Sequence, residues 1–255
     1  MVIVELMSKW ALILQGGTMR GAFLVGAMKT IYRLLGINYF DAIFATSVGV
    51  FEQAFFATNQ INIMENTWRE YVHGNQLINF INPLSGKPIL NLDYLINLFK
   101  SEKSMLDIDV LNESHLKLIT FITDHETREP VAMDLKENPF EIMRATCALP
   151  IFYPPKVIIN NRRYVDCWLA PKQKFQKVLL ENIKEYDNIL VVTVYNKQDD
   201  FLDNIGKVIR PHKVSLWGVL DTNRKRIIET IAQGEKDAEQ FLVNDKTFLL
   251  EQFLS

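Results

Sequence analysis

The amino-acid sequence predicts an α/β protein with a mostly parallel central sheet and helices on both of its faces. Three observations lead to this prediction. Apolar runs too short for a helix end near glycines or small polar residues, a segment with helical spacing follows each run, and this order repeats early in the chain. Parallel strands need such crossover helices. With 255 residues, of which 48% are hydrophobic, the chain can also bury a full-sized core.

The first expected strand covers residues 10–14 (WALIL), a run that is too short for a helix and is bounded by glycine. A helix is expected over residues 19–35, because apolar residues recur there at helical spacing and Gly36 supplies a stop. A second apolar run over residues 40–44 is followed by a second helix over residues 48–58. One strand–turn–helix unit therefore follows another.

Later elements continue this pattern. Further strands are expected over residues 116–123 and 189–194, and Asn160-Asn161 suits the two-residue turn of a hairpin because asparagine tolerates positive φ. Residues 81–90 (INPLSGKPIL) read as a loop inside the domain, and residues 222–254 as largely helical.

The chain contains no internal repeat and no convincing linker. We therefore expect a single domain over residues 1–255. Its motif-bearing core would cover about residues 10–195, followed by a helical C-terminal extension over about residues 196–255.

Composition excludes several classes of function. A net charge of -2 provides no field that would steer a polyanion, so nucleic acid is not an expected partner. Cys147 and Cys167 form neither a disulfide framework nor a metal-type cluster, and the four histidines add no ligand pattern. We expect no metal and no cofactor.

The same features bear on the compartment. Two cysteines fit a reducing environment. No apolar run approaches the roughly 18 residues of a membrane span, and the N-terminus lacks the pattern of a cleaved signal. We expect a cytoplasmic protein, with peripheral membrane contact and export without a recognisable signal left open.

The first strand leads into the turn of LILQGGTMRGAF, residues 12–23. Unpaired backbone N–H groups at such a strand-to-helix turn can bind negative charge. As a phosphate site the turn is weak, because it lacks the lysine and hydroxyl of a P-loop and Thr18 breaks the dinucleotide-binding spacing. Taken alone, the glycines are more often only a tight connection.

The second turn, Ala45-Thr46-Ser47-Val48-Gly49, matches the nucleophile elbow G-x-S-x-G with alanine in the first position. A serine on so sharp a turn is pushed clear of the backbone, and its flanking positions must be small because strand and helix nearly touch. Nearby N–H groups can stabilise an oxyanion. The alternative is that Ser47 only caps the following helix.

An activated serine needs a base, and Asp166 is the best candidate. It follows the second strand of the expected hairpin in RRYVDC, residues 162–167. Upstream, ATCALP (residues 145–150) gives a helix end and a rigid loop that would bring the hairpin to the carboxyl edge of the sheet. The alternative is an ordinary turn aspartate.

Together these motifs resemble the patatin-like phospholipase family of the bacterial type. The family carries G-G-G-x-R-G, G-x-S-x-G, A-x-x-A-x-P and D-G-G or D-G-A; here they read GGTMRG, ATSVG, ATCALP and DCW, in that order. TDHETREP, residues 123–130, resembles the family's strand–turn–strand. The resemblance runs from about residue 10 to residue 194.

The resemblance implies a three-layer α/β/α fold and a serine esterase of lipid metabolism and lipid degradation that cleaves acyl-ester lipids with a Ser-Asp dyad and no histidine. Transient contact with a membrane surface is compatible with such a substrate. The site residues that it implies are Ser47 as nucleophile, Asp166 as base, Gly16, Gly17 and Thr18 as oxyanion hole, Arg20 and Gly21 as loop-shaping residues, and Ala45 and Gly49 as elbow residues.

Three positions depart from the family pattern. Thr18 and Ala45 replace glycines by other small residues, whereas Cys167-Trp168 replaces the two glycines after the aspartate. An indole beside the base would fill the pocket and favour short acyl chains, or else would point into the core. The functional alternative is a catalytically degenerate member that acts as a lipid-binding or interaction module.

Two other features have alternative interpretations. The order Ser47, Asp166, His212 is that of an α/β-hydrolase triad. Those enzymes place several strands before the serine, whereas this chain has two, so His212 is expected in a surface loop. An amphipathic C-terminus would offer a lipid contact, although its mixed charges argue against strong binding to anionic membranes.

Overall fold

The computed structural model describes residues 8–154, 156–214, 218–245 and 247–248. Its centre is one sheet in the order β5-β6-β3-β2-β1-β7-β8, with β4 also paired to β3. The strands are β1 Trp10–Gln15, β2 Ala42–Thr46, β3 Lys117–Asp124, β4 Pro130–Asp134, β5 Val157–Ile159, β6 Arg162–Asp166, β7 Asn188–Thr193 and β8 Lys207–Ile209.

The sheet is parallel from β3 through β2, β1 and β7 to β8, and antiparallel where β4, β6 and β5 join it. The predicted mostly parallel sheet is confirmed. The helices around it are α1 Ala22–Leu35, α2 Gly49–Ala57, α3 Ile61–Glu70, α4 Leu92–Phe99, α5 Ile108–Glu113, α6 Pro139–Thr146, α7 Lys172–Ile183, α8 Asp200–Ile205 and α9 Arg224–Asn244.

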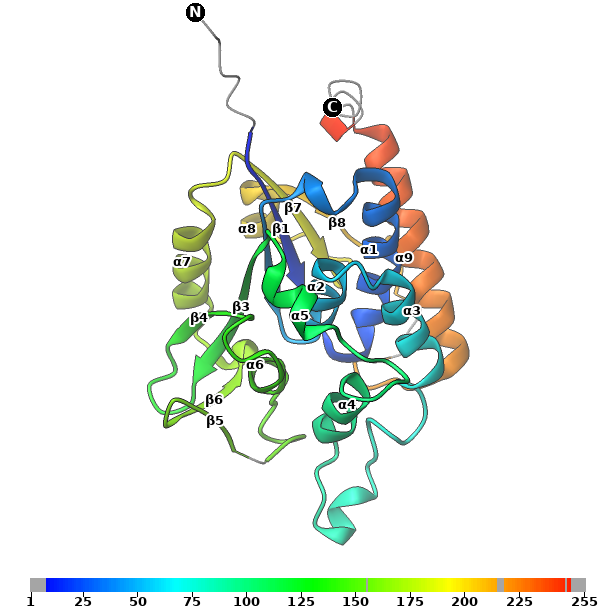
Figure 1. The fold of residues 1–255 in the computed structure, drawn as a ribbon, viewed down its shortest axis with the longest axis vertical. Coiled ribbons are helices and arrows are strands. Elements are labelled where there is room, and N and C mark those ends of the chain that lie inside the picture. Colours follow the sequence, from blue (N-terminus) through cyan, green and yellow to red (C-terminus); the bar gives the residue numbers. More distant parts are fainter. Residues whose placement is uncertain (1–7, 155, 215–217, 246, 249–255) are drawn as a thin grey trace, which may run out of the picture.

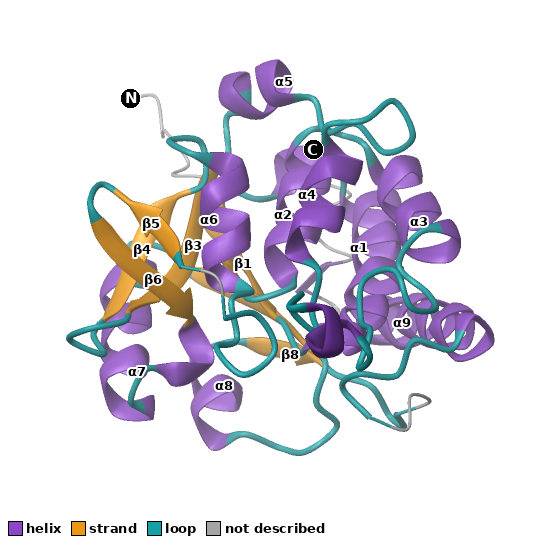
Figure 2. Cartoon of the chain, turned by 90° about the horizontal axis from the view of Figure 1, so that it is seen from below, coloured by secondary structure: helices purple, strands orange, loops and turns teal. Residues whose placement is uncertain are grey.

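Helices cover both faces of the sheet (Figures 1 and 2). Along β1 the side chains alternate between these faces, as in any strand. Leu12 and Leu14 join the larger core under α1, α2 and α9, whereas Ala11 and Ile13 join the smaller core under α7 and α8. The three-layer α/β/α arrangement follows from this alternation.

The early elements lie where the sequence predicts them, with small shifts. The helix expected from residue 19 begins with a 3-10 turn, Thr18–Gly21, before α1, and it ends at Gly36, whose φ is 77°. Asn160 and Asn161 both have positive φ, 49° and 62°, and connect β5 to β6. The predicted hairpin is therefore confirmed.

The segment after residue 195 is not only helical. It contributes β8, which pairs in parallel with β7, as well as α8 and α9. In the part of the chain that the structure describes, no helix is both long and apolar enough to cross a membrane. The predicted C-terminal helix is present as α9, and the last seven residues lie outside the described ranges.

Two glycines allow α1 and α9 to approach closely. A Cβ on Gly26 would lie 1.9 Å from the Ile231 carbonyl oxygen, and one on Gly234 would lie 2.1 Å from the Phe23 carbonyl oxygen. Neither position tolerates a side chain without moving a helix. The apolar face of α9, with Ile227 fully buried, is thus covered by α1 and is not free to contact a lipid surface.

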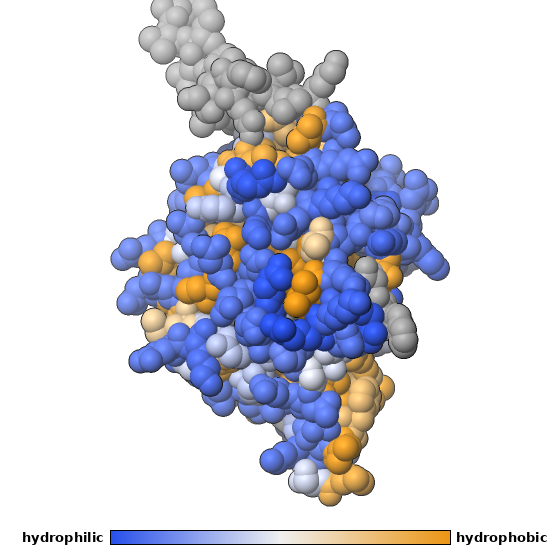
Figure 3. Space-filling view, turned by 90° about the vertical axis from the view of Figure 1, so that its right-hand side faces the viewer, coloured by the Kyte–Doolittle hydropathy of each residue, from blue (hydrophilic) through white to orange (hydrophobic). Residues whose placement is uncertain are grey.

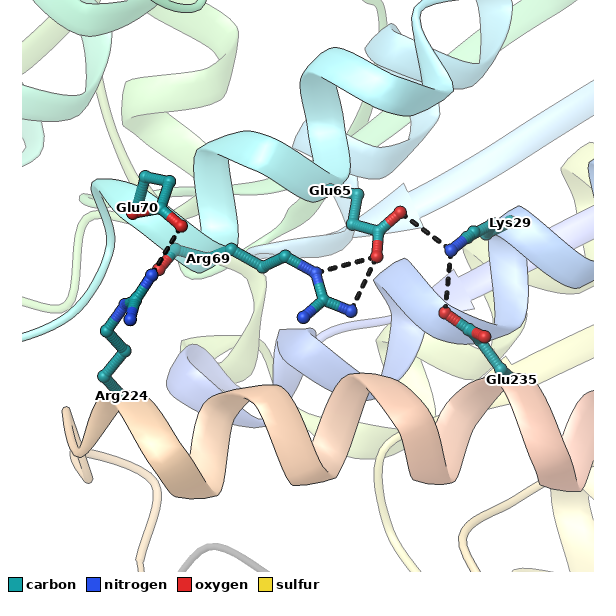
Figure 4. Close-up of polar contacts among 6 residues, drawn as sticks. All are labelled: Lys29, Glu65, Arg69, Glu70, Arg224 and Glu235. Carbon is teal, nitrogen blue, oxygen red and sulfur yellow. Dashed lines mark hydrogen bonds and ion pairs between the residues drawn. The ribbon is translucent and has the colours of Figure 1, made fainter.

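Ion pairs extend this contact to α3 (Figure 4). The Lys29 ammonium group on α1 lies 2.8 Å from Glu65 on α3 and 3.1 Å from Glu235 on α9. Arg224 at the start of α9 pairs with Glu70 at the end of α3. These side chains are partly exposed, so each pair contributes about 0–1 kcal/mol. Their effect is to fix how the three helices are aligned.

Candidate active site

The register of the sheet brings two strand ends together. β4 pairs along one edge of β3, so β2 and β6 must share the other edge. On that edge β2 ends with Thr46 opposite Phe121, and β6 runs in the opposite direction and ends with Asp166 opposite Ile122. The carboxyl ends of β2 and β6 therefore meet head to head, which places Ser47 beside Asp166.

Ser47 occupies the sharp turn between β2 and α2. Its φ is 49°, a left-handed conformation that is uncommon for a residue with a side chain and costs of order 1 kcal/mol. The Ser47 amide donates to the Thr146 hydroxyl at 2.8 Å, and that hydroxyl donates to the Phe121 carbonyl oxygen at 2.8 Å. The turn is thereby held by α6 and β3.

The small residues around the serine are required by close packing. A Cβ on Gly49 would lie 2.8 Å from the Leu14 carbonyl oxygen, so α2 begins almost in contact with β1. Ala45 is completely buried in β2, between Leu14 of β1 and Thr120 of β3. Both positions are thus closely packed, which leaves room only for small residues.

Asp166 is only 1% exposed. One of its carboxylate oxygens accepts the Trp168 amide at 2.8 Å. Burial raises the pKa of Asp166 to about 6, although the Trp168 amide and the nearby Ser47 side chain act in the opposite direction. A carboxylate in this state is a stronger base than one in water.

The Gly16–Thr18 loop lies directly against the elbow. A Cβ on Gly16 would lie 2.5 Å from the Thr46 carbonyl oxygen, and the Gly16 amide donates to the Thr46 hydroxyl at 3.2 Å. Thr18 has a φ of 51° and lines the same cavity as Ser47. Among the described residues, the amides of Gly17 and Thr18 have no hydrogen-bond acceptor.

Arg20 and Gly21 fix the end of this loop. The Arg20 guanidinium lies over the Tyr195 ring, 5.8 Å from its centroid, and the Arg20 amide donates to the Gly17 carbonyl oxygen. A Cβ on Gly21 would lie 2.8 Å from a methyl group of Val48. The loop is thus locked between the elbow and β7's continuation.

The expectation for Trp168 is wrong. Its side chain is 76% exposed and takes no part in lining the cavity, so it neither fills the pocket beside Asp166 nor packs into the core. The physical reason is the 3-10 turn Cys167–Leu169, which begins where Asp166 accepts the Trp168 amide and which directs the indole into solvent. The Trp168 indole therefore leaves the site open, whereas the partly buried Cys167 lies beside Asp166.

An apolar cavity reaches Ser47. Side chains of α2, α3 and α4 line it, together with Leu77, Leu90 and Leu149 from the neighbouring loops. Its free volume is about 40 Å³, room for a few water molecules by the measure that one water needs at least roughly 10–15 Å³. Apolar walls of this kind suit hydrocarbon better than a charged group.

Sequence reasoning missed two groups at this site. Thr146 and Cys147 belong to the ATCALP segment. The Thr146 hydroxyl accepts a hydrogen bond from the Ser47 amide, and Cys147 lines the same cavity as Ser47. Burial raises the pKa of the Cys147 thiol well above its usual value, which keeps it neutral. In the described ranges, no group of three potential metal ligands is found.

Glu52 on α2 is a third residue without a sequence signal. It is completely buried, and one of its oxygens accepts the Trp68 indole N–H at 2.9 Å. Burial raises the pKa of Glu52 to about 8, against the lowering effect of its hydrogen bonds. The side chain is therefore mostly protonated at neutral pH, close to a wall of the cavity formed by Trp68.

This protonation predicts a pH effect on stability. The unfolded chain releases the Glu52 proton above its usual pKa of 4.5, whereas the folded chain retains it up to about 8. The free energy of unfolding should therefore fall as the pH rises through this window, by up to roughly 1.4 kcal/mol per pH unit. In urea unfolding, Glu52→Gln should match wild type near pH 5 and exceed it near pH 8. Identical pH profiles would contradict the assignment, and exposed Glu126→Gln serves as the control.

His212 lies apart from Ser47. Its ring nitrogen Nδ1 contacts Asp237 on α9 at 2.7 Å, and its amide donates to the same carboxylate at 3.0 Å. The cavity that contains Ser47 has no histidine in its lining. His212 thus fixes a surface segment to α9, as expected from the sequence.

Comparisons with known proteins show the family and the fold of the chain. A family model described as patatin-like phospholipase matches residues 12–167. The Escherichia coli K12 protein YjjU is 25% identical over 160 residues, which cover 61% of this chain and 44% of YjjU. The crystal structure of VipD from Legionella pneumophila superposes with a TM-score of 0.53 at 14% identity, covering 92% of this chain and 66% of that one. The chain therefore spans less than two thirds of either protein.

Proposed function

The chain belongs to the patatin-like phospholipase family, and we propose that it is a serine acyl hydrolase in which Ser47 attacks the ester carbonyl of a lipid and Asp166 takes up its proton. The observation that carries this proposal is the head-to-head meeting of β2 and β6. It brings a strained elbow serine, which lines an apolar cavity, to the strand end that carries a buried carboxylate.

Proton transfer in this pair fits the groups present. As Ser47 attacks, its proton moves to the neighbouring Asp166 carboxylate, whose raised pKa favours acceptance. The hydrogen bond from the Trp168 amide orients the Asp166 carboxylate. The proton then passes to the leaving alcohol, and water hydrolyses the acyl-enzyme by the same route.

The negative charge on the carbonyl oxygen needs N–H donors. We assign this role to the amides of Gly17 and Thr18, because the Gly16 amide already donates to Thr46. Gly16 then supports the oxyanion hole by allowing the loop to approach the elbow. Preorganised donors of this kind typically contribute about 10²–10³-fold to the rate.

The alternative of a degenerate member that only binds lipid is less well supported. It rests on the replacement of two glycines by Cys167 and Trp168, yet the Trp168 amide still holds Asp166 and its indole lies in solvent. The experiment is a substrate panel with p-nitrophenyl butyrate and with mixed micelles of phosphatidylcholine or phosphatidylglycerol. Fatty-acid release from the micelles supports the proposal, whereas no turnover of any ester supports the binding module.

The raised pKa of Asp166 predicts the pH dependence of the reaction. A general base must be deprotonated in the free enzyme, so kcat/KM should rise about tenfold per pH unit up to about pH 6 and then level off. Ester hydrolysis followed from pH 4 to 8 measures this step. His212→Ala should leave the midpoint unchanged. A midpoint near 4, or one that moves in the His212 variant, would argue against Asp166 as the base.

A further inference from the structure

The loop expected over residues 81–90 forms a hairpin with an ordered tip. We call residues 78–90 the tip hairpin; a bridge between Ile78 and Leu90 closes it, and the Asn79 amide donates to the Ile89 carbonyl oxygen at 2.8 Å. At the far end a 3-10 turn, Asn82–Ser85, is followed by Gly86 in the left-handed conformation. The hairpin projects from the lower end of the molecule (Figure 1).

The tip exposes apolar side chains that nothing covers within the described residues. Phe80 is 61% exposed, Ile81 67% and Leu84 89%. The neighbouring loop, which we call the Ile151 loop, adds Ile151, whose side chain is 81% exposed. It is joined to the hairpin by the hydrogen bond from the Leu90 amide to the Phe152 carbonyl oxygen. Figure 3 shows apolar surface gathered at this end of the molecule. Single exposed apolar residues are common, but a cluster of this kind marks an interaction site.

The charged side chains within the tip hairpin and residues 147–156 are lysines, and the half-exposed Asp93 that follows at the start of α4 is paired with Arg144. Neither residues 71–92 nor residues 147–156 contain an aspartate or glutamate, whereas Lys87 and Lys156 are exposed. Apolar side chains flanked by cations suit the surface of an anionic bilayer, where lysine interacts with the headgroups and apolar groups enter the acyl boundary.

The hairpin is continuous with the catalytic cavity. Leu77 and Leu90 at its base, and Leu149 before the exposed Ile151, line the cavity that reaches Ser47. An acyl chain leaving a bilayer at the tip would therefore meet apolar side chains along its way. We propose that the tip hairpin and the Ile151 loop form a docking surface for anionic lipid bilayers. This binding goes beyond the proposed hydrolysis and does not depend on it.

The test is cosedimentation with vesicles of phosphatidylcholine and phosphatidylglycerol in a ratio of 3:1, and with phosphatidylcholine vesicles alone. The full-length protein is compared with Phe80→Ser/Ile81→Ser/Leu84→Ser and with a control, Leu180→Ser/Val243→Ser, which removes exposed apolar groups elsewhere. The tip variant should lose roughly 1,000-fold in partition coefficient, since burial of each of the three large apolar side chains is worth about tenfold or more. The control should bind like wild type, and Lys87→Glu should weaken binding only to the anionic vesicles.

The outcomes separate docking from hydrolysis. Vesicle binding that the tip variant loses supports the docking surface, even where no ester is turned over. Circular dichroism and the melting temperature verify that the tip variant is folded, and its rate of p-nitrophenyl butyrate hydrolysis should equal that of wild type. Failure of wild type to bind either vesicle, or equal binding by wild type and the tip variant, overturns the proposal. A self-association that the tip variant abolishes, without vesicle binding, overturns it in favour of a second copy.

Discussion

Replacing Ser47 by alanine is expected to remove almost all ester hydrolysis. The hydroxyl is the atom that would bond to the acyl group, and removal of the nucleophile in a serine protease costs on the order of 10⁶-fold in kcat. The measurement is p-nitrophenyl butyrate turnover by wild type and Ser47→Ala, with circular dichroism and melting temperatures to verify the fold. Exposed Ser85→Ala is the matched control and should retain full activity.

The strained backbone supplies a second variant. Because Ser47 has a φ of 49°, glycine is accommodated there at lower cost than alanine. Ser47→Gly should therefore be as inactive as Ser47→Ala but melt at a higher temperature. Activity that survives in both variants would remove Ser47 from the mechanism, and a higher melting temperature for the alanine variant would contradict the elbow conformation.

Asp166→Asn is expected to lower kcat/KM by about 10²–10⁴-fold, the usual contribution of a general base. Asparagine retains an oxygen that accepts the Trp168 amide, so the 3-10 turn after β6 should persist. The amide cannot accept the Ser47 proton, and the pH step near 6 should disappear with it. The rate of ester hydrolysis as a function of pH measures both effects.

The matched control for this change uses a second buried aspartate, Asp237, whose neighbour His212 is the alternative base. His212→Ala and Asp237→Asn disrupt the contact between the 210–212 segment and α9, which is separate from the cavity at Ser47. Both should retain wild-type kcat/KM. A large loss of kcat/KM in His212→Ala together with a small loss in Asp166→Asn would contradict the dyad and indicate a Ser-Asp-His triad.

Much of this fold could be predicted because its signals are local. The strands and helices up to residue 58 follow from apolar runs, helical spacing and glycine stops, and the hairpin at Asn160-Asn161 follows from the tolerance of asparagine for positive φ. The two glycine-containing turns could be placed at one sheet edge because parallel strands end on the same side.

The remaining features depend on contacts between distant segments. No local sequence pattern predicts that β6 pairs with the same edge of β3 as β2. This pairing nevertheless brings the strand end that carries Asp166 to the strand end that precedes Ser47. The direction of Trp168 depends on the 3-10 turn that Asp166 caps, and the burial of Glu52 depends on how α3 packs over α2. The composition of residues 81–90 is typical of any turn, so it does not predict the 3-10 turn that holds the exposed apolar residues at the tip.

Covalent labelling with a fluorophosphonate, followed by peptide mass mapping, tests the central claim most directly. The reagent reacts with a serine only when its hydroxyl is activated. We predict one adduct per chain on the peptide that contains Ser47, much slower labelling of Asp166→Asn, and none of Ser47→Ala. A wild-type protein that is folded but remains unlabelled, or an adduct on another residue with Ser47 unmodified, would contradict the dyad.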